Sequence, residues 1–492
     1  MEKVILSKST YIRSLQCLKS LYLYKNNYNL KDAISEDKQA IFQRGINVGQ
    51  LAQKLFPGGV ELKPSYRDYN KGFEETQLAL IENTTIYEAS FIYNNVYVAA
   101  DIVQKAPSGN WNVYEVKSSV RLTNTYINDA ALQYYVIKNA GIAIENFYLI
   151  LIDPDYIRGK ELDLAKLFSV TCVTDRLIEL QDRIVTQVNI AKNALAESQA
   201  PEIGVGEHCF SPYDCDFKGH CWSNLPKESV FELSGVSKKD QLDLYNQGIV
   251  KITDIKDSSV FKKSTQTQID SAISNNPTVD KDGLNQFIGQ VKYPIYFLDF
   301  ETFMPAVPYF EGNKPYQHTP FQYSLHIYKD EKSTLEHKEF LAEPFGDPRI
   351  PFMQSLINDL GVDGTILVYN ISFERQILKD LIKKYPVYAD KLKEITNRMV
   401  DLIIPFENKY YYHPAMKGSH SMKYVLPALF PELSYDKLVI KSGAVAMMAF
   451  EKLYHENDII KICETKDALK EYCKLDTLGM VKIFDYLRNV VA

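Results

Sequence analysis

Residues 291–303 read VKYPIYFLDFETF, an apolar run that ends in two carboxylates, Asp299 and Glu301. Alternate residues of a β-strand point to the same face, so this run predicts a buried strand that presents both carboxylates together. Downstream, TILVYN at 365–370 predicts a second strand that leads into a helix. We therefore expect an α/β domain over residues 291–492.

Further acidic residues follow in the same domain. Glu374, in YNISFER, lies where a strand is predicted to turn into a helix, and Asp476, in EYCKLDT, lies on a helix predicted over 465–488. Tyr472 precedes Asp476 by four residues and so shares its helix face. Carboxylates from separate segments suit two divalent cations, Mg²⁺ or Mn²⁺, that activate water and stabilise the leaving oxygen of a phosphodiester. Each short pattern is also common on ordinary surfaces, and it is the order of the segments that favours a site.

The sequence upstream predicts a mixed sheet. Residues 86–93 and 96–103 resemble two strands joined by a turn at Asn94-Asn95, and a third strand is expected over 111–118. A helix over about 126–140 and an apolar strand, FYLILI, come next. Three strands, a crossover helix and a fourth strand predict an α/β domain, which we place at residues 1–225.

This first domain has its own acidic pattern. Asp101 lies at the end of a predicted strand, and Glu115 and Lys117 share one face of the next. Two carboxylates can hold a divalent cation, and a nearby lysine can orient the nucleophile or neutralise the phosphate. The alternative is an ordinary surface strand, which often carries such residues.

Three cysteines occur as C-x5-C-x5-C in GEHCFSPYDCDFKGHCW, namely Cys209, Cys215 and Cys221. Three thiols this close can bind one soft metal centre, although a closed site usually needs a fourth ligand. Cys17, expected on a helix capped by the Ser7–Thr10 segment, is the candidate fourth ligand. The alternative is a zinc site completed by His208 or His220.

Between the two domains, residues 226–290 predict a small helical linker. The stretch KKDQLDLYNQGIVKITDI indicates a helix, a turn at Gly248 and a second helix, a hairpin that can present backbone amides to a phosphate. We favour a plain helical spacer over a hairpin that binds phosphate. The net charge of −6 gives no general attraction for nucleic acid, so binding would depend on local basic patches and cations.

Neither a secretion signal nor a membrane span is expected. The segment MEKVILSKSTYIRS carries charges throughout, and apolar runs stay short of the ~18 residues that a span needs. These features predict a cytoplasmic protein with no membrane partner, in which disulfides are not expected.

The first domain resembles the PD-(D/E)XK nucleases of the RecB type. Asp101, Glu115 and Lys117 match the family's motif, Glu88 is similar to an extra upstream glutamate, and Gln133 matches a glutamine on the following helix. The sequence departs from the family at Ile137, where a tyrosine is frequent, and in RGINVGQLAQ, which lacks the histidine that some members use as a metal ligand. The resemblance implies a site, called the first site below, with catalytic Asp101, Glu115, Lys117 and Gln133 and with metal ligands Glu88, Asp101 and Glu115.

The cysteine layout, one before the nuclease core and three after it, is similar to that of the iron–sulphur nucleases within this group. The resemblance implies a [4Fe–4S] cluster that clasps the two ends of the domain, with zinc as the alternative. Its ligands would be Cys17, Cys209, Cys215 and Cys221.

The last domain resembles the DnaQ-like exonucleases of the ribonuclease-H fold, which have four acidic ligands and a catalytic tyrosine. Glu374 stands where that family has aspartate, and Asp401 and Lys423 are expected either beside the site or in structural roles. The resemblance implies what we call the second site, with metal ligands Asp299, Glu301, Glu374 and Asp476 and with catalytic Tyr472.

The whole chain resembles a bacterial family in which these two nuclease domains are fused. The resemblance implies a metal-dependent nuclease with two active sites that degrades DNA, from single-stranded ends, in repair or in defence against foreign DNA. Two other hypotheses stay open at this point. One is a nucleic-acid-binding protein in which one or both sites are inactive, and the other is a nuclease directed at RNA.

Overall fold

The computed structural model describes residues 5–63 and 68–492 and has a mixed α/β fold, as predicted. The chain divides into two compact units. We call them the N-terminal unit, Met1–Asn224 with Pro305–Gln317, and the C-terminal unit, Leu225–Met304 with His318–Ala492. The division after Asn224 lies within one residue of the predicted end of the first domain, and the predicted linker groups with the C-terminal unit.

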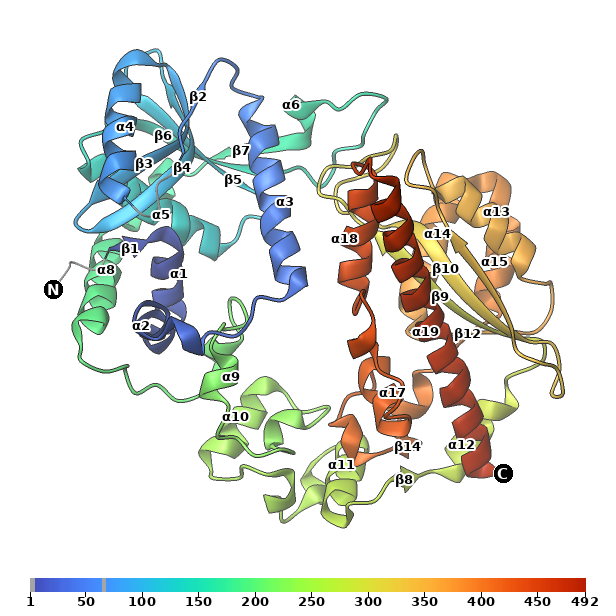
Figure 1. The fold of residues 1–492 in the computed structure, drawn as a ribbon. Coiled ribbons are helices and arrows are strands. Elements are labelled where there is room, and N and C mark those ends of the chain that lie inside the picture. Colours follow the sequence, from blue (N-terminus) through green and yellow to red (C-terminus); the bar gives the residue numbers. More distant parts are fainter. Residues whose placement is uncertain (1–4, 64–67) are drawn as a thin grey trace. The chain divides into compact units, whose positions relative to one another are not determined.

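The N-terminal unit contains a seven-stranded mixed sheet (Figure 1). The predicted hairpin consists of β3 (Thr85–Tyr93) and β4 (Val96–Lys105). At the turn between them, Asn94 and Asn95 have φ angles of 48° and 52°. Positive φ at both central residues is the turn that matches the twist of antiparallel strands, and asparagine tolerates it well. The predicted hairpin is therefore confirmed.

The next elements confirm the predicted crossover. Strand β5 (Trp111–Lys117) pairs antiparallel with β4 and parallel with β6 (Ile144–Ile152). Parallel neighbours need a long connection, and α5 (Asn124–Asn139) provides it. The remaining strands of the sheet are β1 (Leu6–Ser7), β2 (Val60–Glu61) and β7 (Phe168–Cys172).

Helices bury both faces of this sheet. Successive strand residues point to opposite faces, so Leu149 packs in one core with α5 and α8, whereas Ile150 packs in another with α3. This double burial explains why FYLILI is apolar throughout. The helices around the sheet are α3 (Glu36–Gln53), α4 (Tyr69–Glu82), α6 (Leu164–Leu167), α7 (Thr174–Glu179) and α8 (Gln181–Ala196).

The prediction that Cys17 lies on a helix is wrong. Ser7 caps α1 (Lys8–Gln16), and α2 (Leu18–Asn26) follows, but Cys17 between them has extended backbone angles, φ −162° and ψ 119°. Its amide still donates to Arg13 O, and its carbonyl accepts from Leu21 N, so the break leaves both of its backbone groups paired. The apolar stripe is therefore divided between two short helices that meet at Cys17.

The C-terminal unit has a five-stranded sheet in the order β11-β10-β9-β12-β13. Its central strand is β9 (Ile295–Phe303), the run quoted first, which pairs antiparallel with β10 and parallel with β12. The other strands are β10 (Thr319–Tyr328), β11 (Glu336–Leu341), β12 (Thr365–Val368) and β13 (Met399–Asp401).

Two layers of helices cover this sheet and fix the direction of each β9 side chain. Leu298 and Phe300 share a core with α13 (Arg349–Asp359), α14 (Ile371–Lys384) and α15 (Ala389–Asn397). Ile295 and Phe297 face the other way, toward α19. Other helices of the unit are α12 (Lys281–Gly289), α16 (Ile404–Glu407), α17 (Met422–Leu429), α18 (Gly443–Leu453) and α19 (Ile459–Val491).

The segment predicted as a helical hairpin has one α-helix, not two. Helix α10 (Lys238–Asn246) ends before Gly248, whose φ is 84°. After it comes a single 3₁₀ turn, η4 (Ile252–Asp254), and the next α-helix is α11 (Lys263–Ser274). The β-branched residues of IVKIT favour extended backbone, which explains why no second helix begins there. A short ladder pairs β8 (Thr278–Val279) with β14 (Tyr411–Tyr412).

Candidate functional site

Three of the carboxylates predicted for the second site converge. Asp299 and Glu301 continue the row of Ile295 and Phe297 on the β9 face that α19 covers, and Asp476 comes from α19 itself. One carboxylate oxygen of each residue lies within 4.8 Å of the others. Among the described residues this is the one group of three or more acidic, histidine or cysteine residues whose ligand atoms all lie within that distance, and neither the carboxylates of the first site nor the four cysteines meet it.

Glu374 and Tyr472 complete the predicted set. Both line the same cavity as the three carboxylates, with a volume of about 540 Å³. Glu374 lies in the first turn of α14 and is buried, and no donor among the described residues reaches its Oε2. The structure thus brings together Asp299, Glu301, Glu374, Tyr472 and Asp476, which the sequence places in three distant segments.

The carboxylates of this cavity are buried close together and repel one another when they are charged. Burial, together with repulsion from Asp476, raises the pKa of Asp299 well above its usual range. Burial, with repulsion first from Asp299 and then from Asp476, does the same for the pKa of Glu301. Burial raises the pKa of Glu374 in the same way. Lys423 is the one lysine or arginine among the described residues that line the cavity. A site with this excess of buried carboxylates is suited to bound cations, which would balance its charge.

Two further residues line the cavity that the sequence did not indicate. Tyr435 donates a hydrogen bond to Asp476 Oδ1 at 2.5 Å. His318 is hydrogen-bonded through Nδ1 to Thr302 Oγ1 at 2.7 Å, and its ring meets Phe373 edge-on. Both residues lie outside the three acidic segments and carry no spacing signal, so sequence reasoning could not have found them.

The two secondary candidates, Asp401 and Lys423, have different roles. Asp401 has a structural role, because its carboxylate accepts the backbone amides of Asn370 (3.0 Å), Ile371 (2.8 Å) and Ile403 (3.1 Å). It thereby caps the start of α14, where Asn370 has a left-handed φ of 82°. Lys423, in contrast, lines the cavity, and its charge lowers the pKa values of Glu301 and Asp476 against the effect of burial.

The first site is assembled at the ends of β4 and β5. Glu115 is buried, and its Oε1 accepts a hydrogen bond from Lys117 Nζ at 2.7 Å. On the neighbouring strand, Asp101 Oδ2 accepts the amide of Val116 at 2.6 Å. Burial and the adjacent Glu115 raise the pKa of Asp101. The three motif residues are thus close together, as the sequence predicted.

Glu88 and Gln133 border this group. Glu88 lies on β3 between two residues paired with Ile102 and Ala100, hence level with Asp101, and it has a positive φ of 59°. Such backbone strain in a non-glycine residue is typical of functional positions. Gln133, on α5, is fully buried, and neither of its side-chain polar atoms has a hydrogen-bond partner among the described residues.

Two charged residues of the first site were not predicted. Asp129, one turn before Gln133 on α5, accepts a hydrogen bond from Lys117 Nζ at 2.5 Å. Lys8, the first residue of α1, donates to Glu115 Oε1 at 2.7 Å. Burial alone would raise the pKa of Glu115, but Lys117 and Lys8 outweigh it and lower that pKa below its usual range. Helical spacing from Gln133 points to Asp129, whereas Lys8 lies 93 residues before Asp101 in the sequence and no pattern indicates it.

The four predicted cysteines line one cavity of the N-terminal unit. Cys17 comes from the break between α1 and α2, and the others come from the loop that ends in α9 (Lys218–Cys221). Burial raises the pKa of the Cys17 thiol, and proximity to Cys215 and Cys209 raises it further. His208 also lines this cavity, so it remains available as a zinc ligand in the alternative assignment.

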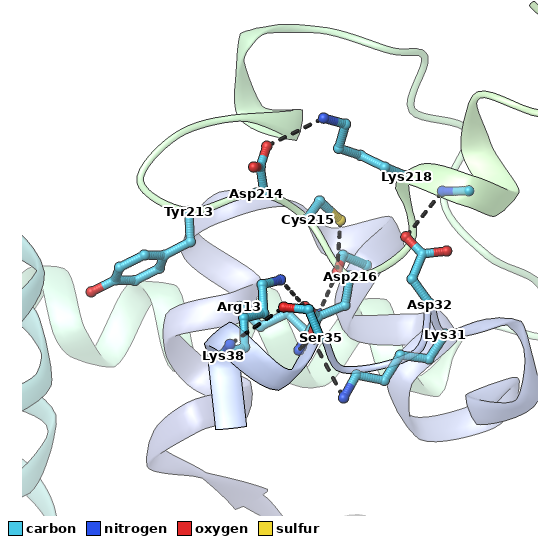
Figure 2. Close-up of polar contacts among 12 residues, drawn as sticks. Arg13, Lys31, Asp32, Ser35, Lys38, Tyr213, Asp214, Cys215, Asp216 and Lys218 are labelled. Atoms are coloured by element: carbon cyan, nitrogen blue, oxygen red, sulfur yellow. Dashed lines mark hydrogen bonds and ion pairs between the residues drawn. The ribbon is translucent and has the colours of Figure 1, made fainter. Parts of the chain in front are cut away.

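Polar contacts tie the cysteine loop to the N-terminal segment (Figure 2). Asp216, next to Cys215, accepts hydrogen bonds from Arg13 (2.8 Å) and Lys38 (3.1 Å) and lies 3.7 Å from Lys31 Nζ. The Asp32 amide donates to Asp216 O at 2.7 Å, and the Asp32 carboxylate accepts the Gly219 amide at 3.0 Å. Gln16 donates to the carbonyls of His208 and Tyr213 at 2.7 and 2.6 Å. The two ends of the unit are therefore joined by protein contacts around the cysteine cavity.

Comparisons with known proteins add little to this geometry. Residues 296–421 match the model of a domain of unknown function, DUF2779. No curated protein matches the chain. A solved structure described as "Crystal structure of SSO0001" is similar over 37% of this chain and 77% of that one, at 15% identity and a TM-score of 0.17, too slight a likeness to carry an argument. Within the described residues, no helix has both the length and the apolar character needed to cross a membrane.

Proposed function

We propose that this protein is a metal-dependent nuclease that cleaves DNA and has two active sites, one in each unit. The observation that carries the proposal is the second site. Asp299, Glu301 and Asp476 approach within 4.8 Å of one another, and Glu374 and Tyr472 line the same cavity. Asp299 and Glu301 lie on the central strand of a mixed sheet and Asp476 lies on the long helix that covers it, which also supports the DnaQ-like resemblance.

The residues of the second site fit divalent cations. The cations would be held by four carboxylates, those of Asp299, Glu301, Glu374 and Asp476. Oε2 of Glu374 has no hydrogen-bond partner among the described residues, so it can serve as a metal ligand. When bound, Mg²⁺ or Mn²⁺ would supply an activated water and charge stabilisation for the leaving oxygen. Tyr472, one helical turn from Asp476, positions the water, and Lys423 offsets negative charge where the phosphate enters.

The first site has the residues for the same chemistry. Asp101 and Glu115 would hold a cation with Glu88, and the buried Oε2 of Glu115 has no partner among the described residues. Lys117 is placed to orient the attacking water, and the unpaired amide of Gln133 offers a further polar group to substrate or water. This site would act on the phosphodiester separately from the second one.

The cysteine cavity is proposed to hold a [4Fe–4S] cluster in a structural role. Four cysteines from opposite ends of the unit line this cavity, and such a centre takes four cysteine ligands. When bound, the cluster would supply a cross-link between Cys17 and the loop carrying Cys209, Cys215 and Cys221. The network around Asp216 provides a second connection between the same segments.

For the substrate, we propose single-stranded DNA ends in the cytoplasm. The apolar and aromatic side chains in the lining of the second cavity, which include Tyr369, Phe373 and Met422, suit an unpaired base beside the carboxylates. RNA presents the same phosphates and, apart from uracil in place of thymine, the same bases. Matched DNA and RNA strands therefore belong in one experiment, and faster cleavage of RNA would replace this substrate assignment.

Digestion of end-labelled single-stranded DNA with Mn²⁺ tests the proposal. We expect cleavage by the wild type that stops with a chelator, partial loss in Asp101→Ala and in Asp299→Ala, and complete loss in the double variant. Glu179→Gln and Glu432→Gln, which change exposed carboxylates in the two units, are the matched controls and should cleave normally. Cleavage that survives in the double variant would show that these carboxylates are not catalytic.

The cluster has a separate test. The purified protein should be brown, with broad visible absorbance and about four irons per chain, and Cys215→Ser should lose both. Cys172→Ser, at an exposed cysteine away from the cavity, is the control. A colourless protein with one zinc per chain would establish the alternative.

A further inference from the structure

The first site contains a second lysine at the same oxygen as the motif lysine. Lys8 Nζ and Lys117 Nζ each lie 2.7 Å from Glu115 Oε1. Lys117 also pairs with Asp129 at 2.5 Å. Glu115 Oε1 is therefore saturated by two ammonium groups, whereas Glu115 Oε2 is buried without a partner among the described residues.

The fold fixes the position of the Lys8 backbone. Strand β1 pairs in parallel with β4, which puts Leu6 opposite Val96 and Ser7 opposite Tyr97. Ser7 then caps α1 in a capping box, with its amide donating to Thr10 Oγ1 at 2.7 Å. Lys8 is the first residue of that helix, so strand pairing and helix capping together fix its backbone beside the site.

The pair also differs from an ordinary surface ion pair. The side chain of Glu115 is 2% exposed and that of Lys8 is 28% exposed. Ion pairs in water contribute little, because solvent screens them and both chains are mobile. A buried carboxylate is different, since losing one partner leaves charge without compensation in a region of low dielectric. Lys8 thus has a large effect on the state of Glu115.

We infer that Lys8 is a positioning residue of the first site, which holds Glu115 through Oε1 so that Lys117 can turn toward the attacking water. Lys117 is engaged twice, by Glu115 and by Asp129, and must give up a partner to orient a nucleophile. With Lys8 in place, Glu115 keeps a cationic partner on Oε1 and retains Oε2 for a cation. The inference rests on the proposed nuclease function of this site.

The inference predicts effects of opposite sign on cation binding and on turnover. Replacing Lys8 by methionine keeps the aliphatic stem but removes a positive charge beside Glu115, so Mn²⁺ should bind about threefold or more tightly. Lys117 then remains held by Glu115, so turnover should fall by roughly tenfold or more. A merely structural role for Lys8 would instead weaken binding, turnover and stability together.

The experiment uses the full chain in the Asp299→Ala background, where the remaining cleavage and Mn²⁺ binding belong to the first site. Mn²⁺ affinity is measured by calorimetry without nucleic acid, turnover with single-stranded DNA, and folding by the unfolding midpoint. Lys8→Arg, which keeps the charge, should recover most of the turnover. Lys166→Ala, at an exposed lysine of the same unit, is the control and should match the background.

The outcomes separate this inference from the proposed function. Unchanged Mn²⁺ affinity and turnover in Lys8→Met overturn the role of Lys8, as does a parallel loss of both that Lys8→Arg does not relieve. If Lys8→Met fails to fold, Lys8→Arg is the deciding variant. Weak turnover with unchanged cation affinity in Lys8→Arg would contradict a role in which Lys8 only needs to place a positive charge at Glu115 Oε1. An absence of cleavage in every variant, with tighter Mn²⁺ binding in Lys8→Met, overturns the nuclease function while the placement of Lys8 stands.

Discussion

The two carboxylate sites differ in where their positive charge comes from. In the first site, Lys8 and Lys117 both pair with Glu115, and its pKa falls below the usual range although it is buried. In the second, Lys423 is the one lysine or arginine among the described lining residues, and the pKa values of Asp299 and Glu301 rise. The first site is thus partly neutralised by the protein itself, whereas the second depends on cations from solution. Burial also raises the pKa of Asp101 in the first site, so the contrast concerns Glu115, and we expect Glu115 and Glu301 to have opposite effects on stability.

The largest expected effect is on turnover in the second site. In an Asp101→Ala background, Asp476→Asn should reduce cleavage by at least about a thousandfold, since it removes a metal ligand and the acceptor of the Tyr435 hydrogen bond. Cleavage rates at saturating Mn²⁺ measure this effect. Glu432→Gln in the same background is the control. If Asp476→Asn lowered the cleavage rate by only about tenfold or less, a ligand role for Asp476 would be contradicted.

Without cations, removing one carboxylate from each site should change the free energy of unfolding in opposite directions. Glu115→Gln should lower the free energy of unfolding by about 3 kcal/mol, because it leaves Lys117 and Lys8 without their buried partner. Glu301→Gln should raise it by roughly 1 kcal/mol, because it relieves repulsion among buried carboxylates. Denaturant unfolding in the presence of a chelator provides the measurement. Two changes of the same sign would remove the electrostatic distinction between the sites.

The pH dependence of these effects follows from the direction of each pKa shift. Glu115 has a lowered pKa, so its contribution to stability is present above its ordinary pKa and is lost as the pH falls through the folded value. Glu301 has a raised pKa, so its cost appears above its ordinary pKa and persists at neutral pH. The gain from Glu301→Gln should therefore shrink toward zero in acid, which unfolding curves at several pH values would show.

Added cations should stabilise mainly the second site. At about 100 times its dissociation constant, Mn²⁺ should raise the free energy of unfolding by about 2.7 kcal/mol through that site. Most of this gain should disappear in Asp299→Ala but remain in Asp101→Ala. Protons compete with the cation for carboxylates of raised pKa, so the gain should grow as the pH rises from about 6 to about 8. Thermal unfolding with and without a chelator checks both statements, and equal losses in the two variants would contradict them.

How far the sequence predicts these sites depends on how each residue is positioned. Asp299 and Glu301 were predictable, because the period of a strand puts both on one face, and Asp476 with Tyr472 because the period of a helix does the same. Tyr435 was not predictable, because it comes from a short 3₁₀ turn whose place beside Asp476 depends on tertiary packing.

The first site shows the same limit. The hairpin and the crossover helix were readable from turn residues and apolar periodicity, and they fix the relative places of Asp101 and Glu115. Lys8 reaches Glu115 only through the pairing of β1 with β4, a two-residue strand with no periodic signal. The break at Cys17 was missed for a related reason, because the apolar stripe continues through it.

The smallest expected effect is that of Tyr435 on turnover, which we compare with that of Tyr472 in the Asp101→Ala background. Tyr472→Phe should lower turnover by about a hundredfold, because its hydroxyl is placed to orient the water. Tyr435→Phe should lower turnover only about threefold, because its hydroxyl donates to Asp476 Oδ1 and acts through that carboxylate. Removing that hydrogen bond frees Oδ1 for a cation, so Tyr435→Phe should also tighten Mn²⁺ binding. If Tyr435→Phe instead abolished cleavage while Tyr472→Phe had little effect, the roles of the two hydroxyls would be exchanged. The second site would then resemble the first more closely, since each would depend on a polar group that sequence spacing does not reveal, Tyr435 in the second site and Lys8 in the first.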